Sequence, residues 1–282
     1  MNCLFFYLDN LIDELYFDRP VQAGDLIETL VAQMYPGRCA DALPFPATAF
    51  RDLWQTGIHG TSWQWQSRMA DAWTRYLWAN LAEATDRRRG TVPKSLEQYL
   101  RMRRTSIGVS PSLGMVERAS RFEICARAYH QSAIQRLETL TCEIIALCND
   151  IASLEKEEAQ GDTYNAVIIL YRFKGLTRDQ ALNHVIAMVR ERAEEFHALS
   201  LQTPRLCEAL ELPPRERIAV ARWVDGARTW IGGNLDWQRE TPRYRTTHPV
   251  QHPTPSWNST RQPFGVSSVW HTPPFDRSAC AR

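Results

Sequence analysis

The feature that most constrains this chain of 282 residues is a long helical pattern over residues 133–158. Apolar residues recur along it at helical spacing and predict a buried stripe of Leu137, Leu140, Ile144, Ile145 and Cys148. Towards its end, Asn149, Ser153 and Glu157 follow one another at four-residue steps. Each step turns a helix by about 40°, so the three side chains share one face over roughly 12 Å. The pattern therefore predicts a helix that is buried on one side and carries polar oxygens on another.

These three side chains offer an amide oxygen, a hydroxyl and a carboxylate, which are hard ligands that suit Mg²⁺. Lys156 falls almost in line with Asn149, so an ammonium group is expected beside the metal. A hard metal next to a cation indicates a ligand that carries phosphate or diphosphate. The sequence predicts such a site at the end of this helix.

Helical patterns also account for most of the remaining chain. We predict helices over residues 1–18, 24–35, 48–57, 61–85, 95–108, 113–129, 163–173, 178–199 and 213–237. We find no convincing strand pattern of period two and no internal repeat. The chain is therefore predicted to be all-α. After Tyr244 the sequence is rich in Pro, Ser and Thr, which predicts a disordered or loosely packed tail over residues 245–282.

The composition of the chain argues against several classes of protein. The formal net charge of +1 gives no long-range field that would favour nucleic acid or an anionic membrane. No apolar run reaches the roughly 18 residues of a membrane span, and the first ten residues lack the basic start of a signal peptide. The seven cysteines form no C-x-x-C pair, which predicts reduced thiols in a cytoplasmic protein. The oligomeric state stays open, a homodimer included.

Residues 149–157 resemble the second metal motif of bacterial class I terpene synthases, N-D-x-x-S-x-x-K-E, with every signature position filled. The segment 161–170, which reads GDTYNAVIIL, resembles the stretch that follows this motif in the family. The region from Met69 to Gly108 is similar to the family's W-x-x-Y-L…P-S-L-E-E-Y-L…R-R-x-T-x-G region. Within that region the resemblance implies an arginine that senses the diphosphate, for which we assign Arg103, with Arg104 as the alternative.

The first helix resembles the family's first metal motif, D-D-x-x-D/E. Asp9 and Asp13 are spaced to share a helix face and follow the pair Phe5 and Phe6. Asn10 stands where the family has its second Asp. Because the first carboxylate carries most of the metal binding in the family, the resemblance implies that Asp9 is the main ligand here and Asp13 a further one.

The end of the helical region resembles the family's W-x-x-G-N-L-x-W…R-Y signature, with Trp230 at its start and Arg243 and Tyr244 at its end. The resemblance, which covers residues 1–244, implies that Arg243 and Tyr244 bind the diphosphate. A guanidinium fork suits phosphate oxygens and a tyrosine adds a hydroxyl donor. Trp230 and Phe6, with Phe5, are our candidates for aromatic faces that stabilise a carbocation, at ~0.5–2 kcal/mol each.

The resemblance implies a helical bundle around a central active-site cavity that binds three Mg²⁺ ions. Its expected activity is ionisation and cyclisation of an allylic prenyl diphosphate. Farnesyl diphosphate is the first choice from family frequency, while C10 and C20 substrates stay open. One alternative is a chain-elongating prenyltransferase, which would need a second Asp-rich motif in place of residues 149–157. The other is a helical protein that has lost catalysis and serves as a binding or structural partner.

The start of the chain carries a separate expectation. Family members place several helices before the first metal motif, whereas here that motif arrives at the ninth residue. The domain over residues 1–244 is therefore expected to lack its N-terminal helices. A nearly all-round apolar helix start, such as the one that contains Leu8, Leu11 and Ile12, needs neighbours that cover it.

Overall fold

The computed structural model describes residues 2–12, 19–35, 37, 43–93 and 95–244, and in these ranges it contains helices and no β-strand. The all-α prediction is confirmed. The elements are α1 (Asn2–Asn10), α2 (Pro20–Ala32), α3 (Phe45–Ile58), α4 (Trp63–Arg88), α5 (Leu96–Ser106), α6 (Val109–Ala119), α7 (Ala126–Tyr129), α8 (Ser132–Gln160), α9 (Ala166–Phe173), α10 (Arg178–Ser200), α11 (Thr203–Ala209), α12 (Pro214–Glu240) and the 3₁₀ turn η2 (Pro242–Tyr244).

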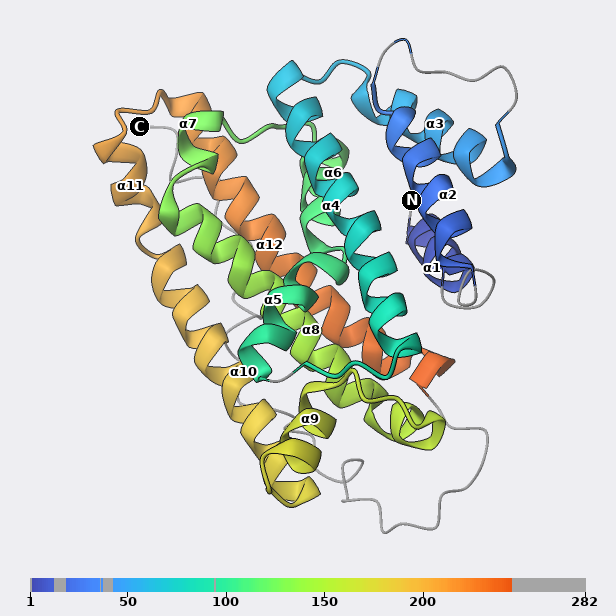
Figure 1. Cartoon of the computed structure of the whole chain (residues 1–282). Helices are drawn as coiled ribbons and strands as arrows, with labels where there is room; N and C mark the ends of the chain where they lie inside the picture. The colour runs from blue at the N-terminus through green and yellow to red at the C-terminus, as the bar shows by residue number, and fades with distance from the viewer. Residues whose placement is uncertain (1, 13–18, 36, 38–42, 94, 245–282) are drawn as a thin grey trace.

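Helix α8 occupies the middle of the bundle (Figure 1) and packs against α5, α6, α9, α10 and α12. Leu137, Leu140 and Ile144 of its apolar stripe are fully buried, as their spacing predicts. The helix ends where Gly161 adopts a left-handed backbone with φ of 72°. Glycine adopts this conformation without steric cost, so it is a common helix terminator. The periodicity of residues 133–158 thus predicted α8 to within two residues at either end.

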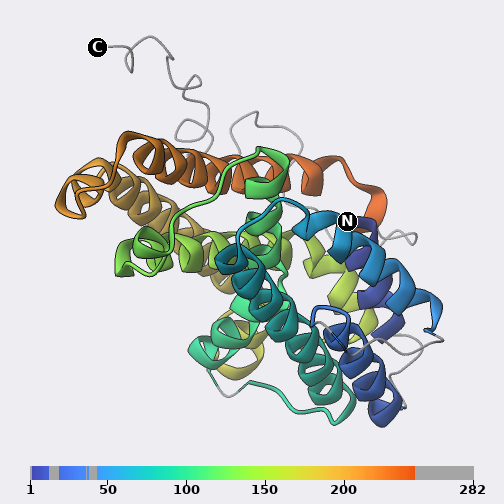
Figure 2. The same ribbon diagram turned by 90° about the horizontal axis from the view of Figure 1, so that it is seen from above.

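Two hydrophobic clusters hold the bundle together. The larger is built from α5 to α12 around α8, and it includes Tyr99, Phe196 and Trp223. The smaller is built from α1 to α4 and includes Leu8, Phe50 and Trp73. Both ribbon views (Figure 1, Figure 2) place α1, α2 and α3 on one side of the molecule and α10 and α11 on the other. Any site that lies between α1 and α8 is therefore bounded by both clusters.

The segment predicted as one helix over residues 113–129 is two helices, α6 and α7. Arg121 between them has a positive φ of 56°, and the backbone N–H of Ile124 donates to the Glu117 carboxylate at 3.0 Å. The bonds of this turn replace those of a continuous helix. Pro111 lies in the first turn of α6, where its missing N–H costs no helical bond. The short helix α11 was not predicted. The predicted helical residues 13–18 and the predicted tail over residues 245–282 lie outside the described residues.

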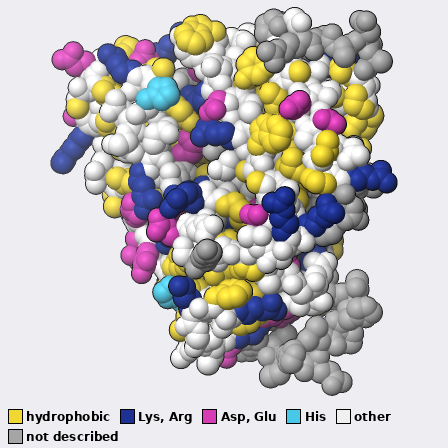
Figure 3. Space-filling model, viewed as in Figure 1, with side chains coloured by type: hydrophobic (Ala, Val, Ile, Leu, Met, Phe, Trp, Pro, Cys, Tyr) yellow, Lys and Arg dark blue, Asp and Glu magenta, His cyan; other side chains and the backbone are white. Residues whose placement is uncertain are grey.

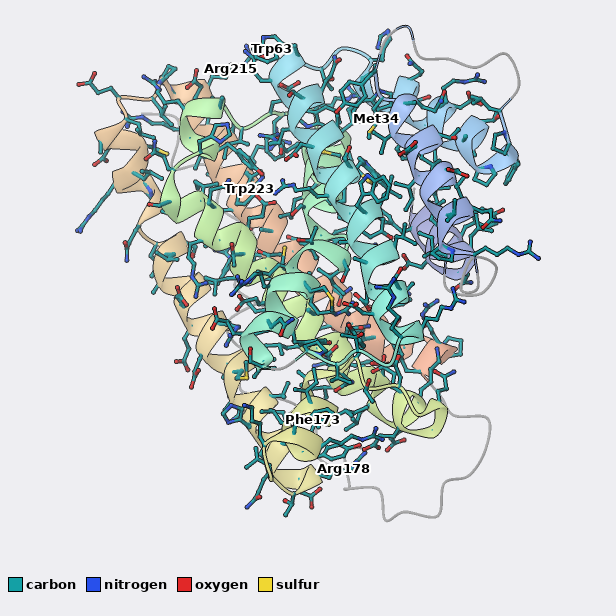
Figure 4. The ribbon with its side chains drawn as sticks, in the orientation of Figure 1. Met34, Trp63, Phe173, Arg178, Arg215 and Trp223 are labelled. Carbon is teal, nitrogen blue, oxygen red and sulfur yellow. The ribbon has the colours of Figure 1, made fainter. Side chains whose placement is uncertain are left out.

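Large apolar side chains remain at the surface of α3 and α4, where Phe45 and Trp63 are each 72% exposed. Hydrophobic atoms are visible on the face drawn in Figure 3 among many charged ones. Figure 4 labels Trp63 at one end of the bundle and Arg178 at the other, where Arg178 pairs with Glu158 at 2.9 Å. Among the described residues, no helix has the length and apolar character that a bilayer crossing requires.

Candidate active site

A cavity of about 730 Å³ lies between α1, α4, α5, α8, α12 and η2. Its lining includes nine of the residues that the sequence singled out, namely Asp9, Arg103, Asn149, Ser153, Lys156, Glu157, Trp230, Arg243 and Tyr244. Phe5 also lines it. Asp13 lies outside the described residues, and the side chain of Phe6 is not described. Segments from both ends of the sequence thus converge on one site.

Asn149 links two of the predicted diphosphate-binding residues. Its Oδ1 accepts a hydrogen bond from Nη2 of Arg103 at 3.2 Å, and its Nδ2 donates to the hydroxyl of Tyr244 at 2.8 Å. The Ser153 hydroxyl donates to the backbone carbonyl of Asn149 at 2.7 Å. The end of α8 is therefore joined directly to α5 and to the turn η2.

Glu157 sits one turn further along the same face of α8. Its Oε2 accepts a hydrogen bond from Nδ2 of Asn165 at 2.8 Å. Burial raises the pKa of Glu157, while the hydrogen bond from Asn165 opposes that rise by favouring the carboxylate. Whether Glu157 is ionised therefore depends on the hydrogen bond that it receives from Asn165.

Arg103 is buried at the wall of the cavity and faces Glu83 of α4 at 3.4 Å. Burial alone would lower the pKa of Arg103, but the nearby acidic groups, Glu83 above all, outweigh that effect and hold it well above its usual value, so the guanidinium stays charged. Arg87 pairs with the same Glu83 at 2.8 Å. Burial pushes the pKa of Glu83 upward, yet Arg103 and Arg87 together bring it below its usual value. The wall therefore holds one buried carboxylate between two cations.

The neighbouring Arg104 does not line this cavity. Its Nε donates to Glu143 at 2.6 Å, and Arg192 of α10 binds the other carboxylate oxygen of Glu143. Of the two arginines that the sequence left as alternatives, Arg103 is the one whose side chain reaches the cavity.

The wall near α1 is aromatic and also holds Asp9, whose Oδ1 accepts a hydrogen bond from the Tyr76 hydroxyl at 2.6 Å. Phe5 stacks on Trp73 with ring centroids 4.6 Å apart and meets Tyr76 edge-on at 5.0 Å. Gly108 has φ of 73°, and a Cβ there would lie 3.2 Å from the Tyr76 ring and 3.3 Å from Phe5. A left-handed residue without a side chain is thus what lets α5 and α6 approach this wall.

The donor set fits a hard divalent cation. Asn149, Ser153 and Glu157 supply amide, hydroxyl and carboxylate oxygens along one face of α8, and Asp9 supplies a carboxylate from α1 to the same cavity. Within the described part of the chain, no three His, Cys, Asp or Glu side chains gather into a metal-holding group.

Among the residues that line the cavity or support its walls, sequence reasoning did not assign Tyr76, Glu83, Arg87 and Asn165. Glu83 and Arg87 carried a signal, since their four-residue spacing places them on one helix face. Asn165 precedes an apolar run, which is typical of a residue that caps a helix N-terminus. Tyr76 is 2% exposed, so its spacing on α4 resembles that of a core residue and does not reveal its bond to Asp9.

Comparison with known proteins agrees with this geometry. The model of terpene synthase family 2, C-terminal metal binding, matches residues 1–195. Pristinol synthase of Streptomyces pristinaespiralis is 34% identical over 254 residues, which are 87% of this chain and 67% of that protein. A (−)-β-caryophyllene synthase of Saccharothrix espanaensis, named as cyclising (2E,6E)-farnesyl diphosphate, is 36% identical over 231 residues, 82% of this chain and 65% of that protein. The crystal structure of germacradien-4-ol synthase from Streptomyces citricolor superposes with a TM-score of 0.75 at 29% identity, covering 84% of this chain and 75% of that one.

The chain belongs to terpene synthase family 2 and is a class I terpene synthase with the all-α fold of that class. The description of the family names metal binding, which implies the use of a divalent metal. The predicted family and fold are confirmed, while the roles of individual site residues remain predictions.

Proposed function

We propose that this chain is a Mg²⁺-dependent terpene cyclase that ionises farnesyl diphosphate and closes the resulting carbocation into a ring. The observation that carries the proposal is a single cavity with oxygen donors and cations on part of its wall and aromatic rings on another part. The farnesyl diphosphate named for the Saccharothrix relative supports a C15 substrate.

Asn149, Ser153 and Glu157 on α8, with Asp9 on α1, would hold the metal, and Asp13 is proposed as a further ligand. When bound, Mg²⁺ ions, three in the family, would neutralise the diphosphate and so make it a better leaving group. These residues provide oxygen atoms without a thiol or imidazole, as a hard cation prefers.

Arg103, Lys156, Arg243 and Tyr244 line the cavity and would bind the diphosphate oxygens. Arg103 is held in its position by Glu83 and Asn149, so its charge is oriented before the substrate arrives. When the allylic C–O bond breaks, the electron pair leaves with the diphosphate oxygen. Cations that face that oxygen stabilise the charge that develops on it, and no proton donor is needed.

The carbocation would lie against Phe5, Tyr76 and Trp230, which line the same cavity. An aromatic face attracts a cation by ~0.5–2 kcal/mol, and apolar rings also exclude the water that would quench it. Phe6 is proposed for the same role from its place in the sequence motif.

Incubation with Mg²⁺ and geranyl, farnesyl or geranylgeranyl diphosphate, followed by gas chromatography with mass spectrometry, tests the proposal. We expect a cyclic C15 product from farnesyl diphosphate. Glu157→Gln, which keeps volume and removes a charge, should lower turnover by about 10–100-fold. An elongated prenyl diphosphate would indicate a prenyltransferase, whereas a folded protein without any product would indicate a binding or structural role.

We further propose that the enzyme works in the cytoplasm and that residues 1–244 form its catalytic domain. Cys142 and Cys148 are buried free thiols, which suits a reducing compartment. Size-exclusion chromatography of the same sample distinguishes a monomer from a homodimer.

A further inference from the structure

Asn165, the residue that precedes α9, is fully buried and touches the candidate metal ligand Glu157. We propose that Asn165 is a positioning residue that fixes the Glu157 carboxylate for metal binding. The inference rests on the proposed function, because it assumes that Glu157 binds the metal. It adds a residue that does not itself touch metal or substrate.

Every hydrogen-bonding group of the Asn165 side chain is engaged. Its Nδ2 donates to the backbone carbonyl of Asp150 at 2.7 Å and to Oε2 of Glu157 at 2.8 Å. Its Oδ1 accepts from the backbone N–H of Val167 at 2.8 Å and of Ile168 at 3.4 Å. Turning the amide over would set its oxygen against two acceptors and its nitrogen against two donors. The arrangement therefore admits one orientation of the amide.

The backbone around Asn165 is also anchored to α8. The Asp150 carboxylate accepts a hydrogen bond from the N–H of Ala166 at 3.0 Å, and the hydroxyl of Tyr99 donates to both of its oxygens at 2.9 and 2.8 Å. Tyr99, Asp150 and Asn165 are each buried to 1% exposure or less. Because buried polar groups are costly to leave unpaired, Asn165 cannot move without breaking bonds that water would not replace. The donor that Glu157 meets is thus fixed in space.

The contact engages one oxygen of Glu157 and restricts the rotation of its carboxylate. Glu157 lines the cavity near the end of α8, where a glutamate side chain without this contact would sample several rotamers. Donors that orient a ligating carboxylate typically change metal affinity by about 10–100-fold when they are removed. Asn165 is placed to have this effect on Glu157.

The chain offers a substitution that separates positioning from helix capping. Asn165→Asp keeps the oxygen that caps α9, since aspartate is a good N-cap residue, but replaces the donor to Glu157 by a second carboxylate oxygen. Asn165→Ser keeps a capping oxygen and removes the donor without adding charge. Thr177→Asp is the matched control, because Thr177 caps α10 through its hydroxyl and does not line the cavity.

The measurement is the thermal unfolding of the purified chain, titrated with Mg²⁺ at a fixed concentration of inorganic diphosphate. We expect Mg²⁺ to stabilise the wild-type protein. The half-saturating Mg²⁺ concentration should rise at least about tenfold in Asn165→Asp and by a smaller factor in Asn165→Ser, whereas Thr177→Asp should match wild type. Asn165→Ser carries the test if Asn165→Asp does not fold.

A second test measures stability without metal and asks whether a substitution at position 157 restores the stability that Asn165→Asp loses. In the double variant Glu157→Gln with Asn165→Asp, the amide introduced at position 157 can donate to the carboxylate introduced at position 165. Without Mg²⁺, the double variant should therefore unfold at a higher temperature than Asn165→Asp alone.

The inference is overturned if wild type is stabilised by Mg²⁺ and both Asn165 variants bind it with the same half-saturating concentration. It is also overturned if the double variant is no more stable than Asn165→Asp. A wild-type protein that Mg²⁺ and diphosphate do not stabilise would instead contradict the proposed function and remove the basis of the inference with it.

Discussion

In the described part of the chain, two buried glutamates are each held between two arginines, and they lie on different helices, Glu83 on α4 and Glu143 on α8. Glu83 meets Arg87 and Arg103 at the cavity, whereas Glu143 meets Arg104 and Arg192 away from it. Because Arg103 and Arg104 are adjacent on α5, one helix supplies both clusters.

The two clusters differ in the distance between arginine and glutamate. Arg104 approaches Glu143 to 2.5 Å, while Arg103 stands 3.4 Å from Glu83 and also faces Asn149 at 3.2 Å. A cation with several long contacts beside an open cavity can exchange one of them for an anionic ligand. A cation in a short pair without such access can only stabilise the fold. The same residue types thus act as a receptor for charge or as a structural pair according to what lies next to them.

A third buried pair shows the effect of a single arginine. Glu117 is bound by Arg68 through both carboxylate oxygens at 2.8 and 2.7 Å. Burial raises the pKa of Glu117 to about 7 although Arg68 opposes the rise. One arginine is therefore insufficient to keep a glutamate strongly acidic at this depth, whereas two hold the pKa of Glu83 below its usual value.

The largest effect is expected from Arg103→Ala. It removes a cation from the cavity and leaves the Glu83 carboxylate facing the diphosphate with one arginine fewer. A loss of about 3 kcal/mol in transition-state stabilisation corresponds to roughly 100-fold in turnover. Release of diphosphate from farnesyl diphosphate measures it.

Arg104→Ala is its matched control, since it removes the same side chain one residue further along the helix. It should lower the melting temperature and leave turnover within about twofold of wild type. Equal losses of turnover in the two variants would mean that the clusters do not differ in function.

The next effect concerns stability. Glu143→Gln leaves Arg104 and Arg192 without their shared carboxylate, and their partial exposure of 36% and 18% limits the cost to about 2 kcal/mol. Urea unfolding measures the change, and turnover at 25 °C should not alter. Glu195→Gln breaks the more exposed pair with Arg136 and should cost less than about 1 kcal/mol. If both variants lose the same stability, burial does not distinguish these pairs.

A smaller effect is expected at the mouth of the cavity. Arg243 lines the cavity yet is exposed, so Arg243→Lys should preserve the melting temperature. The variant keeps the charge and loses the planar fork, and we expect KM to rise about tenfold. An unchanged KM would remove Arg243 from the site.

The last prediction is a pH dependence of stability that comes from Glu117 and is measured as a slope. Between pH 4.5 and about 7 the folded state keeps a proton that the unfolded state has released, because the pKa is higher in the fold. The stability from this group is complete below pH 4.5 and is lost as pH rises towards 7, at no more than about 1.4 kcal/mol per pH unit. Urea unfolding from pH 5 to 8 measures the slope, and Glu117→Gln should reduce it. Identical slopes would contradict the raised pKa.

Local patterns predicted the helices best where periodicity and a terminator coincide. The helix predicted over residues 133–158 matches α8, because its apolar stripe is followed by the terminator Gly161. The break between α6 and α7 was missed because Arg121 takes a positive φ without being glycine, and tertiary bonds to Glu117 stabilise that turn. The predicted helix over residues 163–173 began too early, since Asn165 caps α9 instead of joining it.

The sequence motifs predicted which residues line the cavity, but they did not predict the contacts that hold those residues in place. Spacing placed Asn149, Ser153 and Glu157 on one face of a helix, and the structure finds all three at one cavity. Glu83 could not be assigned, because its partner Arg103 lies on another helix and only the packing of α4 against α5 brings them together. The roles of all these site residues stay predictions, and for Asp13 and Phe6 so does their place at the cavity.

Gly108 limits how this enzyme could be redesigned. A side chain there would have to accept a left-handed backbone and contacts of 3.2 and 3.3 Å with two aromatic rings. Ile145 and Thr229 also line the cavity and already carry side chains of adjustable size. A library aimed at new ring systems should therefore vary those two positions and keep residue 108 as glycine, because any other residue at 108 would be strained by the left-handed backbone and would push against the two rings.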